Sequence, residues 1–492
     1  MSTETGALRR PAFGLAVAAV SIPMFMVALD NLVVTNALAE IKRDLDTTVQ
    51  GLQWITNAYI LGFAGFLLVA AGLGDRLGRR RVFLTGLIAF TAFSIGCALS
   101  TSDGMLIVFR ALQGISAAAV MPLSLTMLTV AVPPEKRGVA IGVWSSVSSL
   151  AVGVAPLLGG AITTGIGWHW LFWINVPICL IAVPLVLRGV GESHGQRAGL
   201  DVLGLVLGCL GVLSLVWGII DAGEHGWGSG RVVALFVAAV LLLGGFVLWE
   251  RRAAAPLLPL RIYRSRAFTL VNLASLAVYF GLFGSIFFLA QYLQVVRGHS
   301  PFVAGLWTLP WAIVPMFVAP FAGKLTPQLG ANRLIGAGLG FSAVGLGWCA
   351  LVVGADTSDV ALVVPFILAG LGTGLIFAPS AAVVVSSVQP QDIGKASGTN
   401  TTVREIGSAL GIAVLTTVFT VRGGYASPQA FTDGMVPGLW ICVVVLLVGA
   451  VLAAAIPSPR PPAAATAPGA GQPPVPARSD APAGANPSRS DS

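Results

Sequence analysis

The sequence predicts an all-α protein that crosses a membrane many times. Hydrophobic residues make up 56% of its 492 residues and charged residues only 10%, whereas soluble domains carry about 25% charged residues. Lys, Glu, Arg and Asp normally cover a soluble surface, and these are too few to do so. Composition therefore excludes a soluble enzyme, a disordered scaffold and a secreted disulfide framework.

Fourteen apolar runs are long enough to cross the hydrocarbon core, which takes about 20 helical residues. The first follows Arg9 and Arg10 but lacks a small-residue cleavage site, so we expect an uncleaved span rather than a signal peptide. In chain order the runs are 12–38, 51–73, 82–101, 104–131, 138–163, 169–189, 200–220, 231–250, 267–294, 302–323, 332–354, 360–386, 394–421 and 436–456.

The basic residues set the orientation. With the N-terminus inside, 21 of the 28 Lys and Arg residues fall in inner segments and five in outer ones, while Arg110 and Arg404 lie within spans. This positive-inside bias predicts that both termini are cytoplasmic. The net charge of +8 therefore comes from short inner loops, and no nucleic-acid partner is expected. The cysteines lie singly in apolar runs and the histidines are scattered, so no metal site or cofactor is expected.

An internal repeat divides the chain. Residues 71–81 follow the second span and residues 323–333 follow the tenth, and a shift of 252 residues overlays Gly78 on Gly330 and Arg81 on Arg333. Repeated loops at equivalent places are typical of transporter folds built from duplicated halves. The domains expected are a cytoplasmic N-terminus at 1–11, six-helix halves at 12–190 and 267–456, and an inserted helix pair at 200–250.

Two further segments are not spans. Residues 251–266 combine apolar residues with five arginines, so we expect them to lie on the anionic cytoplasmic leaflet. Residues 457–492 are rich in Pro, Ala, Gly and Ser without periodicity, which predicts a disordered cytoplasmic tail.

Several motifs together resemble one family. Gly72-Leu-Gly-Asp-Arg-Leu-Gly-Arg-Arg-Arg81 resembles the signature loop of the major facilitator superfamily, with Ala71 in place of its first glycine. Leu29-Asp-Asn-Leu-Val-Val-Thr-Asn-Ala-Leu38 is similar to the first-helix signature of the fourteen-span drug:proton antiporters, the EmrB/QacA type, although Leu32, Thr35 and Ala39 depart from it. The segments 110–114, 142–160, 292–301 and 404–407 also match that pattern, so the resemblance runs from about residue 12 to 456.

The resemblance implies a multi-pass protein of the bacterial plasma membrane that exports lipophilic drugs or antibiotics by alternating access. Its partners would be a small lipophilic or cationic substrate and protons, and it would function as a monomer. A nutrient or metabolite carrier of the same fold and a non-transporting membrane sensor are the alternatives. An ATP-driven pump is disfavoured because no Gly-x-x-x-x-Gly-Lys-Ser/Thr loop is present.

Three ionisable residues inside spans are the proton-coupling candidates. Asp30 lies about 12 Å from the outer end of its span and Arg110 about 9 Å, so the two are plausible partners. Charged groups at such depths are costly and usually functional. Glu405 lies midway along the thirteenth span, where the resemblance implies cation or proton binding. The structural alternatives are a frayed helix end for Asp30, a snorkelling arginine for Arg110 and a structural salt bridge for Glu405.

Two motifs suggest gating and sealing. In the inner loop, Asp75 can dock against a helix end and a basic partner while a glycine permits the turn; the alternative is that the arginines only hold the loop inside. The gating residues are Asp75, Arg76, Gly78, Arg79 and Arg80. The motif on the fifth span predicts a kink and close helix packing, which the resemblance reads as a seal against leak. Its residues are Gly142, Ala151, Ala155, Pro156, Gly159 and Gly160.

Aromatic residues could line a lipophilic, cation-tolerant cavity through dispersion and cation–π contacts. Membrane interfaces and lipid-facing surfaces also collect aromatic residues, so for any single residue the plainer interpretation is stronger. The candidates are Trp54, Tyr59, Phe283, Phe287 and Trp311.

Overall fold

The computed structural model describes residues 13–34, 37–195, 201–253, 256–355 and 357–457, and within them the chain is helical without strands. Both the predicted N-terminal segment and the tail after Pro457 lie outside the described residues. The α-helices are α1 Phe13–Val33, α2 Leu38–Asp44, α3 Val49–Leu77, α4 Arg79–Ala98, α5 Asp103–Ala131, α6 Arg137–Ile166, α7 Trp170–Trp173, α8 Asn175–Gly189, α9 Val202–His225, α10 Gly230–Glu250, α11 Arg266–Gln291, α12 Pro301–Leu329, α13 Ala331–Val352, α14 Val363–Ser386, α15 Ile393–Arg422 and α16 Pro428–Ala454.

Fourteen helices of the described chain are long and apolar enough to cross a membrane, which confirms the predicted number of spans. The short helix α7 joins α8 in one such stretch, Trp170–Gly189. The first span is shorter than expected, because α1 ends at Val33 and the polar helix α2 follows as a separate element.

Side-chain caps explain where several spans begin. Thr48, Ser102 and Ser229 each precede a helix and accept a hydrogen bond from the backbone N–H three residues on, at 3.1, 3.3 and 3.3 Å. Such caps satisfy donors that have no partner in the first turn. Apolar runs set the lengths of these helices, and hydroxyl residues mark where they start.

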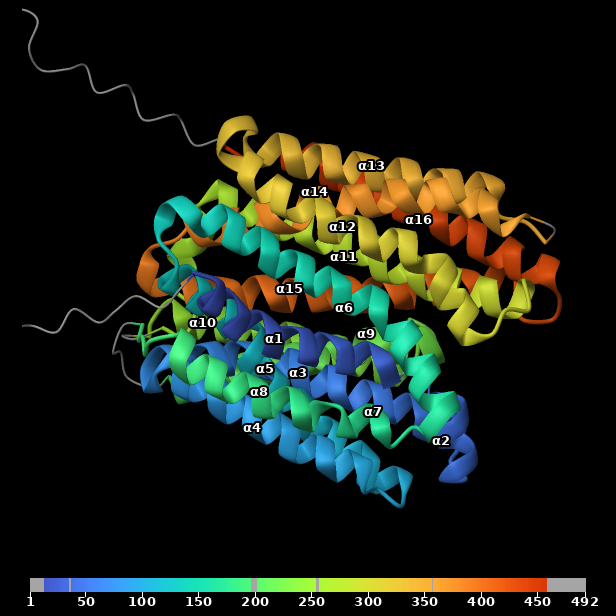
Figure 1. Ribbon diagram of the computed structural model, residues 1–492, viewed down its shortest axis with the longest axis horizontal. Helices are drawn as coiled ribbons and strands as arrows, with labels where there is room; N and C mark the ends of the chain where they lie inside the picture. Colours follow the sequence, from blue (N-terminus) through green and yellow to red (C-terminus); the bar gives the residue numbers. More distant parts are fainter. Residues whose placement is uncertain (1–12, 35–36, 196–200, 254–255, 356, 458–492) are drawn as a thin grey trace, which may run out of the picture. The chain divides into compact units, whose positions relative to one another are not determined.

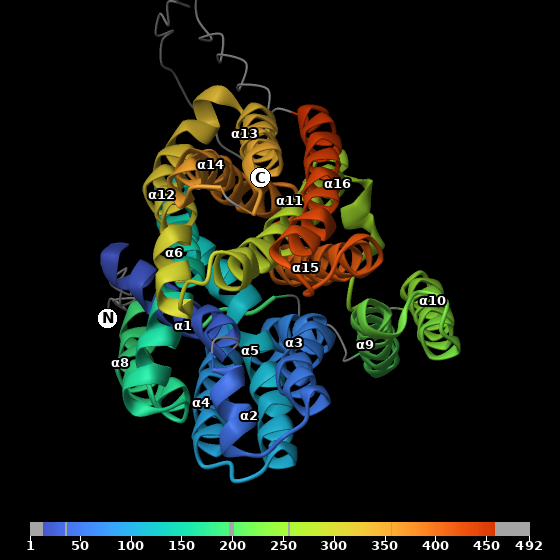
Figure 2. The same cartoon turned by 90° about the vertical axis from the view of Figure 1, so that its right-hand side faces the viewer.

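The helices lie side by side in two bundles with an appended pair (Figure 1). α1, α3, α4, α5, α6 and α8 pack as one half, and α11 to α16 as the other. The halves meet mainly where α6 packs along α12 and where α15 contacts α3 and α5. Figure 2 shows α9 beside α3 and α15, with α10 beyond it, packed against α9. The two halves and the inserted pair are thus as predicted.

The repeated loop is almost entirely helical. α3 runs to Leu77 and α12 to Leu329, so a single glycine separates each from the next helix. Gly78 has φ 110° and Gly330 has φ 86°, values that favour glycine. Each donates its backbone N–H to the carbonyl four residues earlier, at 3.1 and 3.0 Å. The same turn at positions 252 residues apart supports the duplication.

Candidate functional site

A buried ion pair lies inside the first half. Arg110 Nη1 on α5 donates to Asp30 Oδ2 on α1 at 2.7 Å, and the two side chains are fully buried. Gln113 Nε2 and Asn175 Nδ2 donate to Asp30 Oδ1 at 3.0 and 2.7 Å. The carboxylate therefore holds three donors from α5 and α8, which compensates the cost of burying its charge. The expected pairing of Asp30 with Arg110 is confirmed.

The guanidinium of Arg110 is enclosed on its other sides. The Tyr59 ring lies 4.1 Å from its central carbon, within cation–π range. Its Nη1 also donates to Gln113 Oε1 at 2.8 Å, and its Nε to the carbonyl of Ile55 at 3.4 Å. An arginine held this way cannot snorkel to a membrane surface, so that alternative is wrong.

Asn175 extends the network to α4. Besides Asp30, its Nδ2 donates to Ser94 Oγ at 2.8 Å, and Ser94 donates to the carbonyl of Phe172 at 2.9 Å. Sequence reasoning did not single out Gln113, Asn175 or Ser94. Gln113 could have been found, because a polar residue three positions after Arg110 lies on the same helix face.

The motif on α6 packs against both halves. Ala151 and Ala155 are fully buried against Leu29, the neighbour of Asp30. On another face, a Cβ added at Gly142 would lie 2.7 Å from Pro320 Cα of α12. The expected close packing is therefore present. Gly159 and Gly160 are also buried, while the side chain of Pro156 lies outside the described residues.

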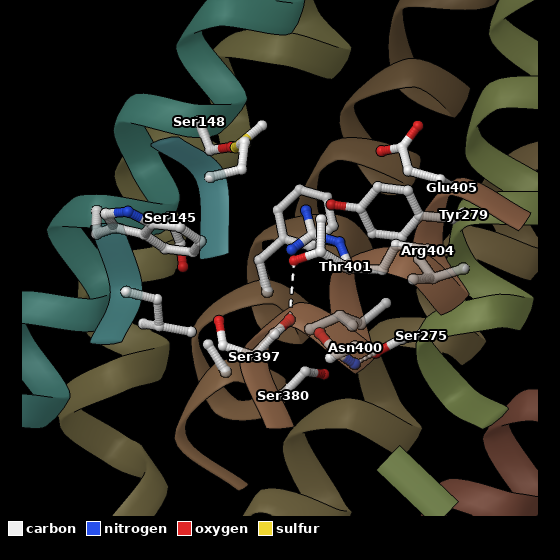
Figure 3. A pocket seen from close by; sticks show the side chains of 17 residues that line it. Ser145, Ser148, Ser275, Tyr279, Ser380, Ser397, Asn400, Thr401, Arg404 and Glu405 are labelled. Atoms are coloured by element: carbon white, nitrogen blue, oxygen red, sulfur yellow. Dashed lines mark hydrogen bonds between the residues drawn. The ribbon is translucent and has the colours of Figure 1, made fainter. Parts of the chain in front are cut away.

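A central cavity lies between the halves, bounded by α5, α6, α11, α14 and α15 (Figure 3). Its wall is mixed: hydroxyl and amide groups, the aromatic rings of Trp144, Tyr279 and Phe377, and one residue of each charge. Its volume is about 30 Å³, enough for a water or two. Drug-sized ligands occupy roughly 300–1,000 Å³, so in this conformation the cavity is closed around very little space.

Glu405 and Arg404 bring the charges to this cavity. The Arg404 guanidinium stacks over the Tyr279 ring at 4.2 Å, and Figure 3 shows both side chains beside Glu405. Within the described part of the chain, the Glu405 side chain makes no hydrogen bond or ion pair, and it is half-buried. The alternative of a structural salt bridge is therefore not supported.

The predicted aromatic lining needs correction, because none of the five candidates faces this cavity. Tyr59 covers Arg110, and Trp311 is buried against Phe366. Phe283 stacks on Tyr279, within the packing of the second half. Phe287 is exposed, and Trp54 lines a different cavity beside α9. The lining aromatics are other residues, since residue type alone does not say which helix face turns inward.

The inner loop forms a buried contact between the halves. Arg79 Nε donates to Asp75 Oδ1 at 2.9 Å, and the Nη2 atom of the same guanidinium lies 2.8 Å from that oxygen as an ion pair. A Cβ added at Gly394, in the first turn of α15, would lie 2.8 Å from the same oxygen. Asp75 therefore has both the basic partner and the helix end expected for it, and the positive end of α15 favours the carboxylate. We call the contact of Asp75 with Arg79 and Gly394 the inner latch.

The other loop arginines differ in surroundings. Arg76 is exposed, whereas Arg80 Nη1 donates to the carbonyl of Val190 at 3.2 Å. Glu192, which sequence reasoning missed, accepts the backbone N–H groups of Arg80 and Arg81 at 2.9 and 3.2 Å. It thereby caps the start of α4.

Residues 256–262 contact the protein beside the inner latch. Lys395 Nζ donates to the carbonyl of Pro256 at 2.8 Å, and Arg261 pairs with Asp392 at 2.9 Å. Leu257, Leu258 and Ile262 are buried. Leu257 lies beside Gly72 of α3, where an added Cβ would be 2.5 Å from its Cδ1, and the turn Leu260–Arg264 packs against α11. All five arginines of residues 251–266 are exposed, and so is Tyr263.

Two helical halves around a closed central cavity, with buried charges in the spans, define a membrane transporter. Residues 20–412 match the family model of the Major Facilitator Superfamily. The chain belongs to this superfamily, so it is a transporter of small molecules rather than an enzyme, and a multi-pass protein of the bacterial cell membrane.

The chain is similar to several named proteins. It is 35% identical to the tetracenomycin C resistance and export protein of Streptomyces glaucescens, over 89% of this chain and 84% of that protein. It is 36% identical to the cephamycin export protein CmcT of Amycolatopsis lactamdurans, over 88% and 90% of the two chains. It is 35% identical to the puromycin resistance protein pur8 of Streptomyces alboniger, over 87% and 88%.

A solved structure shares the fold. The crystal structure of the human organic anion transporter MFSD10 (TETRAN) matches with a TM-score of 0.61, covering 89% of this chain and 100% of that chain at 13% identity.

Proposed function

We propose that this protein exports lipophilic or cationic drugs or antibiotics in exchange for protons, as an antiporter of the fourteen-span EmrB/QacA type. Membership of the superfamily supports transport, and the relatives named for export of tetracenomycin C and cephamycin support efflux of antibiotics. The intramembrane ionisable groups supply candidate sites for the coupling ion.

The observation that carries the proposal is the separation of two charged sites. Asp30 is sealed within the first half by Arg110, Gln113 and Asn175, and none of these four residues lines the central cavity. Glu405 lines that cavity instead. A proton on Asp30 and a substrate in the cavity therefore occupy different places, and the helices between them must couple the two events.

Asp30 has a route for the proton. It lines a second, small cavity together with Asn175, Leu158 and Ile162. This cavity has a volume of about 10 Å³, close to the minimum that holds one water. Ile162 belongs to the last turns of α6, at the predicted outer end. A water here would deliver protons to Asp30 from outside, the side from which an exporter takes them.

Protonation of Asp30 would release the tie between α1 and α5. The neutral carboxyl loses its Coulomb attraction to Arg110, and the guanidinium keeps its other contacts, which are the rings of Tyr59 and Phe172, the Gln113 side chain and the Ile55 carbonyl. Because Ala151 and Ala155 of α6 pack beside Asp30, and α6 also contacts α12, a shift of α1 reaches the interface between the halves. This chain of contacts is our proposed path from proton to gate.

Transport further requires the inner end to open. The inner latch joins α3 and α4 to α15, and a Cβ added at Gly138 would lie 2.7 Å from the Gly323 carbonyl of α12. These contacts close the cavity on the side of the arginine-rich loops. Breaking them gives access from the cytoplasm, which is the inward step of alternating access.

The surroundings of the transporter complete the proposal. Arg251, Arg252, Arg264 and Arg266 are exposed at the inner end, where they would attract anionic lipid headgroups. Each half of the chain completes the other around one cavity, so a monomer suffices for function.

The test uses inverted membrane vesicles that carry the full chain. With a pH gradient imposed, added puromycin should accumulate inside the vesicles and discharge the gradient, and a protonophore should abolish both. An uptake carrier would give movement in the opposite direction, and a sensor would give none. Either result would refute the proposal.

A further inference from the structure

One cavity of the described chain, larger in volume than the central cavity, has no part in the mechanism above. It has a volume of about 170 Å³ and lies between α3, α9 and α10. Gln53 and Trp54 are near the start of α3, Asp221 is near the end of α9, and Arg231 is at the start of α10. These ends are the predicted outer ends of their helices. We call this space the outer cavity.

A buried carboxylate lines the outer cavity. Asp221 is 4% exposed, and its Oδ1 lies 3.3 Å from both His225 Nδ1 and Arg231 Nη2. Its Oδ2 is also buried, yet it has no hydrogen-bond partner within the described residues. A buried carboxylate oxygen without a donor costs free energy. The protein's own side chains thus leave one acceptor of the cavity unused.

Two tryptophan rings line the outer cavity together with this carboxylate. Trp54 of α3 and Trp217 of α9 meet edge to face, with ring centroids 5.6 Å apart. The Arg231 guanidinium already lies over Trp217, 5.5 Å from the ring centroid. The ring face therefore accepts a cation. Arg231 is 52% exposed, so a competing cation could displace it into water at modest cost.

We propose that the outer cavity binds a small protonated amine. The ammonium would donate to Asp221 Oδ2 and lie against Trp217 and Trp54, while Arg231 swings outward. The volume of about 170 Å³ lies below the roughly 300–1,000 Å³ of drug-sized pockets, which suits a small ligand. Gln53 and Asn57 offer amide groups for any polar end of the ligand.

The outer cavity is distinct from the central one in both place and ligand size. Its lining comes from α3 and the inserted pair, and it shares no residue with the central cavity. A bound amine would bridge α3 to α9, the helix that also packs against α15. The inserted pair thus gains a role, as the wall of an external amine site.

The test is calorimetric titration of the full chain in lipid nanodiscs. The probe is benzylamine at neutral pH, with benzyl alcohol as a neutral molecule of the same shape. Wild type should bind benzylamine saturably. Benzyl alcohol and the variant Asp221→Asn should each bind about tenfold more weakly or worse, since a charge-assisted hydrogen bond is lost. Arg231→Gln should bind more tightly, because the competing internal cation is gone.

Two further variants make the result specific. Trp217→Leu should weaken benzylamine several-fold, whereas Trp227→Phe should not, because Trp227 stacks on Phe236 outside the outer cavity. Equal binding of benzyl alcohol and benzylamine would overturn the proposal, as would unchanged affinity in Asp221→Asn. If Asp221→Asn does not fold, the other two variants decide. The proposal is then overturned if Arg231→Gln binds benzylamine more weakly than wild type, or if Trp217→Leu binds it with unchanged affinity.

Discussion

Replacing Asp30 by asparagine tests the buried network most directly. The three groups that contact this carboxylate, Arg110 Nη1, Gln113 Nε2 and Asn175 Nδ2, are all donors. Asparagine offers one acceptor oxygen and one NH₂ group. If its oxygen keeps the two amide donors, its NH₂ faces the guanidinium at the former ion-pair distance of 2.7 Å. No orientation of the new side chain satisfies all three.

The magnitude follows from the burial of both partners. Considering Asp30 alone, a neutral amide is cheaper in the membrane than a carboxylate. With Arg110 present, the substitution is instead expected to lower the free energy of unfolding, because Arg110 is fully buried and would lose its counter-charge. Removing one partner of a buried pair costs about 3–5 kcal/mol. The double variant Asp30→Asn with Arg110→Gln carries no charge in the network, so we expect it to recover much of that loss.

Two assays separate stability from coupling. Thermal unfolding in nanodiscs should rank wild type first, the double variant next and Asp30→Asn last. Puromycin uptake driven by a pH gradient in inverted vesicles, normalised to folded protein, should be lost in both variants. Substrate exchange without a gradient should survive in the double variant, since exchange needs the conformational change but no net proton movement.

The reasoning fails on either of two results. Wild-type gradient-driven uptake by Asp30→Asn would remove Asp30 from proton coupling and leave Glu405 as the candidate. Unfolding of Asp30→Asn at the wild-type temperature would show that Arg110 does not depend on this partner for its burial.

Four other outcomes are expected. Asp75→Asn and Gly394→Ala should each lower the rate of transport with little change in substrate affinity; the Cβ added at Gly394 would lie 2.8 Å from the Asp75 carboxylate. Turnover and half-saturation in proteoliposomes measure the two quantities, and a large loss of affinity would contradict the inner latch. Gly142→Ala should destabilise the protein by about 1–3 kcal/mol through overpacking against Pro320, whereas Gly244→Ala, where an added Cβ meets nothing within 4 Å, should not, and equal unfolding temperatures would refute the close contact. Glu405→Gln should reduce efflux of cationic compounds more than that of neutral ones in growth-inhibition profiles; a uniform loss would argue for a structural role. Arg261→Gln, which breaks the 2.9 Å pair with Asp392, should expose residues 256–262 to limited proteolysis, and an unchanged cleavage pattern would show that the buried leucines alone hold the segment.

The sequence by itself determined the membrane class, the fourteen spans and the two halves. Crossing a bilayer is a local property, because about 20 apolar residues must follow one another wherever a helix spans. The repeat was equally local, since Gly78 and Gly330 each mark a turn that favours glycine. Depth along a helix is also set by residue number, which is why Asp30 and Arg110 could be matched in advance.

Only the tertiary structure decided which side chains share a space. Asn175 donates a hydrogen bond to Asp30, and the Tyr59 ring packs on Arg110 instead of lining the central cavity. Such contacts depend on how each helix is rotated about its axis. Leu257, Leu258 and Ile262 are buried in the core of the second half, and the Trp54 ring meets the Trp217 ring of the inserted pair. Protein and lipid are both apolar surroundings for such residues, so composition cannot distinguish them. Whether an apolar side chain packs on protein depends on the shape of the surfaces that the folded helices present.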